Sequence, residues 1–155
     1  MKHIKNLKIV ITAGASGIGS KIAQILSQAD AKVVICDKDQ EVLDQFSKNN
    51  PEVITLKADV SNEEEVTSFF NEIKDHFGEI NSLINNAGIA GPSAKLEDTN
   101  FDDWKNTLSV NLNGTFLCTK SAIPLLRSAG GGSIINIGST SSFMGTPLRS
   151  SYSAT

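Results

Sequence analysis

The stretch Lys8-Ile9-Val10-Ile11-Thr12-Ala13-Gly14-Ala15-Ser16-Gly17-Ile18-Gly19 decides the fold of this chain. It begins as an apolar, β-branched run of strand length and passes into a glycine-rich turn. The segment that follows carries apolar residues at helical spacing, namely Ile22, Ala23, Ile25 and Leu26. Glycines let a ligand approach the main chain, and a helix start directs unpaired N–H groups at it. The order of strand, turn and helix therefore predicts a dinucleotide site, although glycine turns also end ordinary strands.

Size and composition favour a single globular domain over residues 1–155. The chain is 39% hydrophobic and 20% charged, which is too apolar for a disordered segment. Its net charge is -3 and no basic stripe is visible, so we expect neither nucleic acid nor an anionic membrane as a partner. No apolar run approaches the roughly 20 residues of a membrane helix. The short run before Gly14 does not fit a signal peptide, and a cytoplasmic protein is expected.

The cysteines and histidines give no sign of a disulfide or a metal site. Cys36 and Cys118 each lie in an apolar segment, and we expect both to be buried free thiols. His3 and His76 are far apart and have no partner pattern, so no metal is expected.

Five apolar runs of strand length alternate with four helical patterns. We expect strands from Lys8 and at 32–36, 53–57, 82–85 and 133–137. The helices are expected after Gly19, at 39–48, from a cap at Ser61 or Asn62 to Gly78, and at 101–127. The last of these carries apolar residues at Trp104, Leu108, Leu112, Phe116 and Leu117. Continuous apolar strands are typical of a parallel sheet covered on both faces, so the expected fold class is α/β and doubly wound.

Polar or small residues follow each expected strand, where ligands of such sheets bind. Asp37 comes 18 residues after Gly19 and can accept hydrogen bonds from a ribose 2′-hydroxyl. It can also cap the next helix, as Asp39 can; we favour the ribose contact because of the preceding glycine turn. Asp59-Val60 follows the third strand and Asn86-Ala87-Gly88 the fourth. Ser139 follows the fifth, and Tyr152 comes 13 residues later.

These motifs resemble the classical short-chain dehydrogenase/reductase family over the whole chain. Thr12 to Gly19 is similar to the family's cofactor turn, with three residues between its first and second glycine positions. Asp59 is similar to its adenine-side acid, and Asn86-Ala87-Gly88 to its Asn-Ala-Gly motif. Asn111 matches its helical catalytic asparagine, and Ser139 and Tyr152 match its catalytic serine and tyrosine in spacing.

The resemblance implies a Rossmann fold with strand order 3-2-1-4-5 and a bound nicotinamide cofactor. The activity it implies is hydride transfer between that cofactor and a small secondary alcohol or ketone. Tyr152 would donate or accept the proton, Ser139 would hold the carbonyl oxygen, and Asn111 would keep a water in the proton relay. The cofactor-binding residues expected on this basis are Gly14, Ser16, Gly17, Ile18, Gly19, Asp37, Asp59, Val60, Asn86, Ala87, Gly88 and Tyr152.

Asp37 favours NAD over NADP, because a carboxylate at that place would repel a 2′-phosphate. The resemblance also implies a homodimer or homotetramer built on the 101–127 helix and its following neighbour.

The sequence departs from the family pattern in two places. Ala13 stands at the first glycine position. Either Gly14 supplies the backbone freedom that the turn needs, or Ala13 itself adopts the required backbone angles. The printed sequence ends at Thr155, one residue before the position of the family's lysine and before the family's sixth and seventh strands. In the family, the ammonium group of this lysine favours the phenolate form of the catalytic tyrosine, which Tyr152 matches. We therefore expect residues 1–155 to be an incomplete NAD-binding domain with little activity by itself.

The sequence leaves room for two other functions. A chain that ended at Thr155 would act as a non-catalytic nucleotide-binding or interaction module, with its fifth strand as an exposed edge. A sugar-nucleotide epimerase of the extended type is disfavoured, because it has two residues rather than three between the early glycines.

Overall fold

The computed structural model describes residues 4–155 and is built on a parallel sheet of five strands. The strands are β1 (Lys8–Thr12), β2 (Lys32–Asp37), β3 (Ile54–Lys57), β4 (Ser82–Asn85) and β5 (Ser133–Asn136). Their order is β3-β2-β1-β4-β5, and every neighbouring pair is parallel, which confirms the expected α/β fold and strand order.

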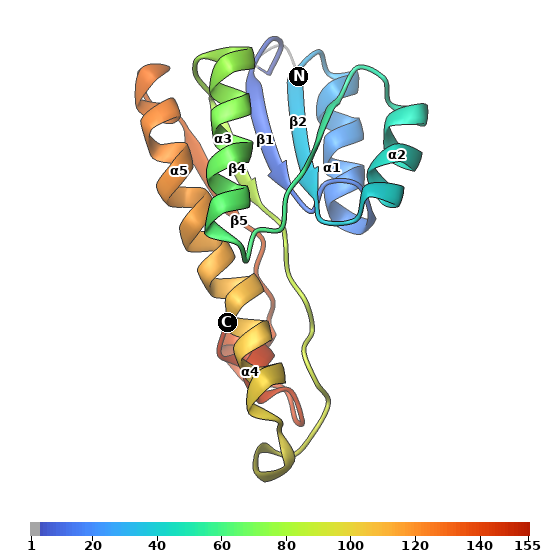
Figure 1. Cartoon of the computed structure of the whole chain (residues 1–155), viewed down its shortest axis with the longest axis vertical. Helices are drawn as coiled ribbons and strands as arrows, with labels where there is room; N and C mark the ends of the chain where they lie inside the picture. Colours follow the sequence, from blue (N-terminus) through green and yellow to red (C-terminus); the bar gives the residue numbers. More distant parts are fainter. Residues whose placement is uncertain (1–3) are drawn as a thin grey trace.

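Helices cover both faces of this sheet (Figure 1). The helices on one face are α1 (Gly17–Gln28) and α2 (Gln40–Asn49), and those on the other are α3 (Glu63–Phe77) and α5 (Gly114–Ser128). Successive residues of β1 point to opposite faces: Val10 packs with the α3 and α5 side chains, and Ile9 and Ile11 with those of α1 and α2. Burial on both faces is why the interior positions of the central strands are continuously apolar.

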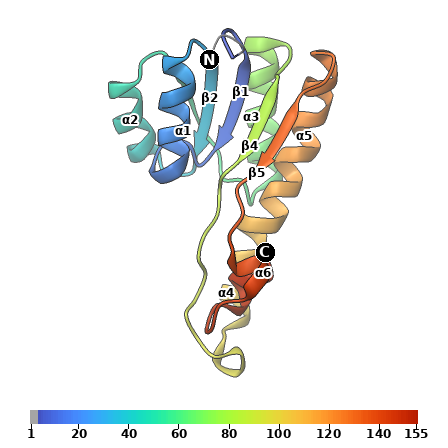
Figure 2. The same cartoon turned by 180° about the vertical axis from the view of Figure 1, so that it is seen from behind.

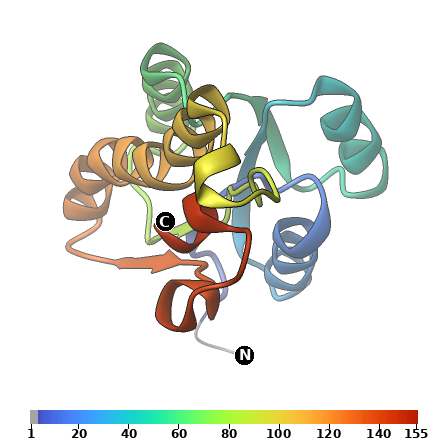
Figure 3. The same ribbon diagram turned by 90° about the horizontal axis from the view of Figure 1, so that it is seen from below.

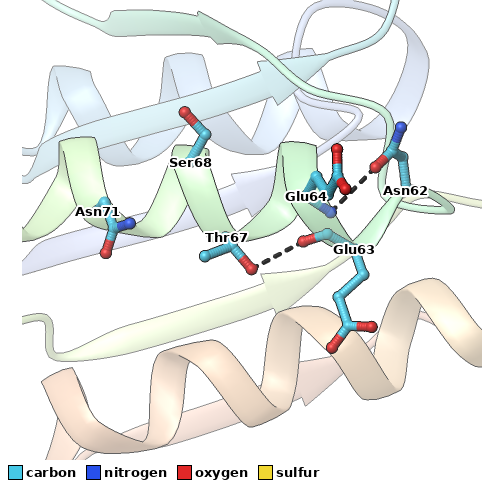
Figure 4. Close-up of a pocket in the computed structure, with 6 residues that line it drawn as sticks. All are labelled: Asn62, Glu63, Glu64, Thr67, Ser68 and Asn71. Carbon is cyan, nitrogen blue, oxygen red and sulfur yellow. Dashed lines mark hydrogen bonds between the residues drawn. The ribbon is translucent and has the colours of Figure 1, made fainter.

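Asn62 is the cap of α3, which settles the choice between it and Ser61. Its side-chain oxygen accepts hydrogen bonds from the N–H groups of Glu64 and Glu65. Figure 4 shows this cap and the adjoining polar face of α3, where the Thr67 hydroxyl donates to the Glu63 carbonyl. The helix ends at Gly78, which has φ +71° as expected for a left-handed cap.

The long helical stretch expected over 101–127 is present, but it is not α-helical throughout. The structure has α4 (Phe101–Leu108), a π-helical turn η2 (Ser109–Asn113) and then α5. A π turn has more residues per turn than an α-helix. Residues that share a face by α-helical spacing therefore do not share one when the spacing is counted across the π turn. Leu112 and Phe116 were expected among the apolar positions and are 50% and 62% exposed. Ile25 of α1, placed at helical spacing with Ala23, is likewise exposed.

The segments that follow β4 and β5 extend beyond the carboxyl ends of the strands. Figures 1 and 2 show α4 and the adjoining part of α5 beside the extended loop after β4, which contains a single 3-10 turn, η1 (Leu96–Asp98). Two one-turn helices missed by the sequence analysis pack here, α6 (Ser141–Met144) and α7 (Ser150–Ser153). In residues 4–155, no helix has the length and apolar character needed to cross a bilayer.

The turn between β1 and α1 is fixed to the end of β4 by Thr12 and Asn86. The Thr12 hydroxyl accepts hydrogen bonds from the N–H groups of Asn86 and Ala87, both at 3.0 Å. The Asn86 side-chain amide donates to the carbonyls of Thr12 and Ala13, also at 3.0 Å. These four bonds join the two strand ends that flank the predicted site.

Both cysteines are fully buried in the core, in β2 and α5. Burial raises the pKa of the Cys36 thiol far above its ordinary value and that of Cys118 to about 12. Since the thiolate is the reactive form, we expect neither thiol to react with a thiol-specific dye at pH 8 in the folded protein. Both should react once guanidinium unfolds the chain. Rapid labelling of either cysteine in the native state, read by mass spectrometry, would contradict this placement.

Replacing Thr12→Val should lower the free energy of unfolding by about 1–3 kcal/mol, because two N–H groups lose their shared acceptor. The shape of the side chain is nearly unchanged. Thr12→Ser keeps the hydroxyl and serves as the matched control, so it should lose much less. Chemical denaturation of the two variants gives the comparison, and equal losses would show that the hydroxyl does not hold the two strand ends together.

Candidate functional site

A cavity of about 160 Å³ opens at the carboxyl ends of the sheet. Its lining comes from the segments after four different strands, β1 to β4, and from the π turn. The lining residues that the sequence predicts are Ser16, Asp37, Asp59, Val60, Ala87 and Gly88. The lining residues that it does not predict are Ala13, Lys38, Ala58, Ile89 and Val110. Lys38 and Ile89 directly follow selected residues, so extending each motif by one position would have found them.

The structure separates the roles of Asp37 and Asp39. Asp39 is the cap of α2, since its carboxylate accepts from the N–H groups of Glu41 and Val42 at 2.9 and 3.3 Å. Asp37 ends β2, lines the cavity and accepts only a long bond of 3.3 Å from the Asp39 N–H. Its carboxylate is therefore not needed for the helix cap and is available at the cavity wall.

Asp59 brings a second carboxylate to the cavity. Its Oδ1 accepts from the N–H and the hydroxyl of Ser61, at 2.9 and 2.7 Å, which orients the side chain. The main-chain N–H of Asp59 donates to Glu65 at 2.9 Å, tying the loop to α3. Carboxylates accept hydrogen bonds only, so this end of the cavity suits a ligand that presents hydroxyl or amino donors.

The glycine turn contributes one exposed and one packed set of residues. Ser16, Gly17 and Ile18 are exposed at the start of α1, and Ser16 makes no side-chain cap bond. Gly14 and Gly19 are buried instead: a Cβ at Gly14 would lie 2.5 Å from Ile35, and one at Gly19 would overlap the Ala13 carbonyl. The first group leaves the N–H groups of the helix start open to a ligand, and the second lets the turn fold tightly.

Ala13 takes the left-handed conformation itself, with φ +48°. Of the two possibilities for the missing glycine, the structure therefore has the one in which alanine adopts the required angles. This conformation costs a non-glycine residue about 1–2 kcal/mol, which the four bonds between Thr12 and the Asn86 segment help to offset. The turn keeps its geometry without the first glycine.

Asn111 holds the loop after β4 from within the π turn. Its side-chain oxygen accepts from the Ile89 N–H at 2.8 Å, and its amide donates to the Ile89 carbonyl at 3.0 Å. The same amide donates to the Thr155 hydroxyl at 3.0 Å, and this hydroxyl donates to the Tyr152 carbonyl. The structure thus brings Asn111 next to the helix that carries Tyr152, although the two are far apart in sequence.

Ser139 and Tyr152 lie on the segment that follows β5, at the same end of the sheet as the cavity. The Ser139 hydroxyl oxygen accepts a hydrogen bond from the N–H of Ser141, the first residue of α6, at 3.2 Å. Tyr152 is half-buried on α7. The two short helices contact each other, and the Thr146 N–H, in the loop between them, donates to the Ser153 hydroxyl at 3.1 Å. Figure 3, which looks onto this end of the molecule, shows α7, next to the C-terminus, beside the yellow segment that contains the start of α4.

The cavity suits one part of a dinucleotide. Pockets for drug-sized ligands typically measure roughly 300–1,000 Å³, and this one holds about 160 Å³. The cavity therefore suits only part of such a ligand, whose donor groups the two carboxylates can accept. The open glycine turn beside it suits the phosphates, and Ser139 and Tyr152 lie on the loops beyond. The residues present therefore fit a nicotinamide dinucleotide laid along the sheet edge.

Comparison with known proteins points to one family. The family model described as short chain dehydrogenase matches residues 7–155. An uncharacterized oxidoreductase of Bacillus subtilis, YxbG, is 39% identical over 99% of this chain and 58% of its own length. An NADP-dependent (R)-specific alcohol dehydrogenase of Lentilactobacillus kefiri is 36% identical over 98% of this chain and 62% of its own.

A solved structure of NAD⁺-bound xylitol dehydrogenase superposes with a TM-score of 0.92 at 25% identity. The alignment covers 99% of this chain and 60% of that one. The chain thus spans about three-fifths of the length of these relatives. The strand order, the glycine turn and the family match over residues 7–155 agree, and the chain belongs to the short-chain dehydrogenase family.

Proposed function

We propose that this protein is a nicotinamide-dependent oxidoreductase that interconverts a small secondary alcohol and its ketone, with NAD as its preferred cofactor. The observation that carries the proposal is the Asp37 carboxylate, which lines the cavity at the end of β2 while Asp39 serves the helix. Family members with both cofactors are known among the relatives above, so the family does not decide between them. The charge at position 37 is the reason for choosing NAD.

The cofactor would lie across the carboxyl ends of β1, β2 and β4. Asp37 accepts hydrogen bonds from the adenine-side ribose, and Asp59 with Val60 borders the adenine. The open N–H groups near Ser16, Gly17 and Ile18 face the pyrophosphate, where the positive end of α1 favours negative charge. Gly88 leaves space beside Asn111, since a Cβ there would lie 3.6 Å from the Asn111 side-chain oxygen.

Three residues of this chain would carry the proton chemistry. When bound, the nicotinamide ring supplies or accepts the hydride. The Tyr152 hydroxyl gives its proton to the substrate oxygen during reduction and takes it back during oxidation. The Ser139 hydroxyl donates a hydrogen bond to the same oxygen and orients it. Asn111 holds the loop after β4 in place and lies next to α7, where it can retain a water on the path by which Tyr152 exchanges its proton.

The substrate side of the site would be apolar. Phe143, Met144 and Leu148 lie between Ser139 and Tyr152 and are 93%, 86% and 51% exposed. We expect them to form part of the wall against which a substrate packs. We also propose a homodimer or homotetramer, because Phe101, Leu112 and Phe116 form an exposed apolar series along α4, η2 and α5.

Replacing Asp37→Asn should shift the preference from NAD toward NADP. Removing the charge abolishes the repulsion of a 2′-phosphate and weakens the ribose contact, so the ratio of kcat/KM for NAD over NADP should fall roughly tenfold or more. Asp39→Asn is the matched control, since it removes a neighbouring charge while asparagine still caps α2. A wild-type preference for NADP, or the same ratio in both variants, would refute the assignment of NAD.

Replacing Tyr152→Phe should lower kcat by roughly 10²–10⁴-fold in the full-length protein, since only the proton-carrying hydroxyl is lost. Cofactor affinity, measured by fluorescence titration with NADH, should stay close to the wild-type value. Ser150→Ala removes a hydroxyl from the same helix and should retain turnover. The assay uses a panel of secondary alcohols and ketones, and a Phe variant that turns over at the wild-type rate would exclude Tyr152 as the proton donor.

A further inference from the structure

We propose that Arg149 is a positioning residue for Tyr152: by holding the carbonyls of Ala90 and Gly91, its guanidinium fixes α7 against the loop after β4. This inference rests on the proposed function of Tyr152. It concerns a side chain that none of the family motifs above includes, and it explains how a helix of a single turn is held at a defined place. The contacts that carry it join segments 58 and 59 residues apart in the sequence.

Arg149 binds the loop after β4 with its side chain and starts α7 with its main chain. Its Nη1 donates to the Gly91 carbonyl at 2.8 Å and to the Ala90 carbonyl at 3.3 Å. Its own carbonyl accepts from the Ser153 N–H at 2.8 Å, the bond that closes the turn around Tyr152. One residue therefore ties the turn that carries the phenol directly to the loop after β4.

The loop after β4 and the segment before α7 also pack closely beside the contacts of Arg149 with Ala90 and Gly91. Gly91 has φ +64°, and a Cβ there would lie 2.5 Å from the Thr107 hydroxyl and 2.8 Å from that of Ser151. Ser151 precedes Tyr152 and is only 1% exposed. Leu148, on the other side of Arg149, accepts from the Ala94 N–H at 3.0 Å and has φ +62°. A left-handed leucine is uncommon, and the bond to Ala94 is the tertiary contact that holds its carbonyl in place.

The stretch 89–91 is thereby held by two side chains from different elements. Asn111 binds both main-chain groups of Ile89, and Arg149 binds the carbonyls of the next two residues. Asn111 also reaches the end of α7 through Thr155, so α7 is fastened near both of its ends to the same short stretch. A single helical turn is unstable by itself, and its orientation must come from such tertiary bonds.

The test compares three variants in the full-length protein: Arg149→Ala, Arg149→Lys and Arg127→Ala. Arg127 is the only other arginine of residues 1–155 and is exposed at the end of α5, so it is the matched control. Arg149→Ala should lower kcat by about tenfold to a hundredfold, because a displaced catalytic group loses rate steeply. The dissociation constant for NADH should not change, since Arg149 does not line the cavity. Arg149→Lys and added guanidinium at low millimolar concentration should each restore part of the rate.

Two results would overturn the inference. One is an Arg149→Ala protein whose kcat equals that of Arg127→Ala. The other is a joint loss of NADH affinity and rate that neither lysine nor guanidinium restores. If the wild-type protein reduces no carbonyl compound at all, the proposed function fails. Hydrogen exchange then tests separately whether Arg149 fixes α7 against the loop after β4. Faster exchange of the Ala94 amide in Arg149→Ala than in Arg127→Ala supports this role, and equal exchange refutes it.

Discussion

The hydrogen bonds between Thr12 and the Asn86 segment are the interaction on which the rest of this end of the molecule depends. Parallel pairing of β1 with β4 brings the ends of these two strands side by side. The residues that follow must then leave the sheet in different directions, one into α1 and the other into the long loop. The Thr12 hydroxyl accepts hydrogen bonds from two N–H groups and so fixes the direction in which both segments leave the sheet. The open glycine turn and the wall formed by Ala87 and Gly88 face the same cavity for this reason.

A second set of bonds extends this order outward from the sheet. Asn111 holds Ile89, and Arg149 holds the next two carbonyls, so the loop after β4 is fastened residue by residue as it passes the π turn and α7. Loops at the ends of parallel strands are usually the mobile part of such folds, because they lack ladder bonds. Here side chains take the place of the ladder, and the segment that carries Tyr152 gains a defined position relative to the cavity.

The electrostatics of the cavity follow from how helix caps are assigned. Asp39 and Asn62 satisfy the first turns of α2 and α3. Asp37 and Asp59, which end or follow the neighbouring strands, are thereby left at the cavity wall. Two carboxylates at one wall favour donors and disfavour a further phosphate. The proposed preference for NAD therefore rests on Asp39, and not Asp37, being the cap of α2.

The sequence by itself determined the elements of the sheet and the positions at which their motifs lie, because apolar runs, glycines and caps act locally. The alternation of strands and helices, a cap at Ser61 or Asn62 and the left-handed end at Gly78 all follow from side chains within a few residues. The π turn at Ser109–Asn113 became visible only in the tertiary structure, where Asn111 binds Ile89 of a loop that is distant in sequence. The tertiary structure also showed that Ala13 adopts the left-handed backbone conformation and that Asp37 does not cap α2. The contact of Arg149 with Ala90 and Gly91 has no sequence signal, because it joins two loops that meet only when β4 and β5 pair in the sheet.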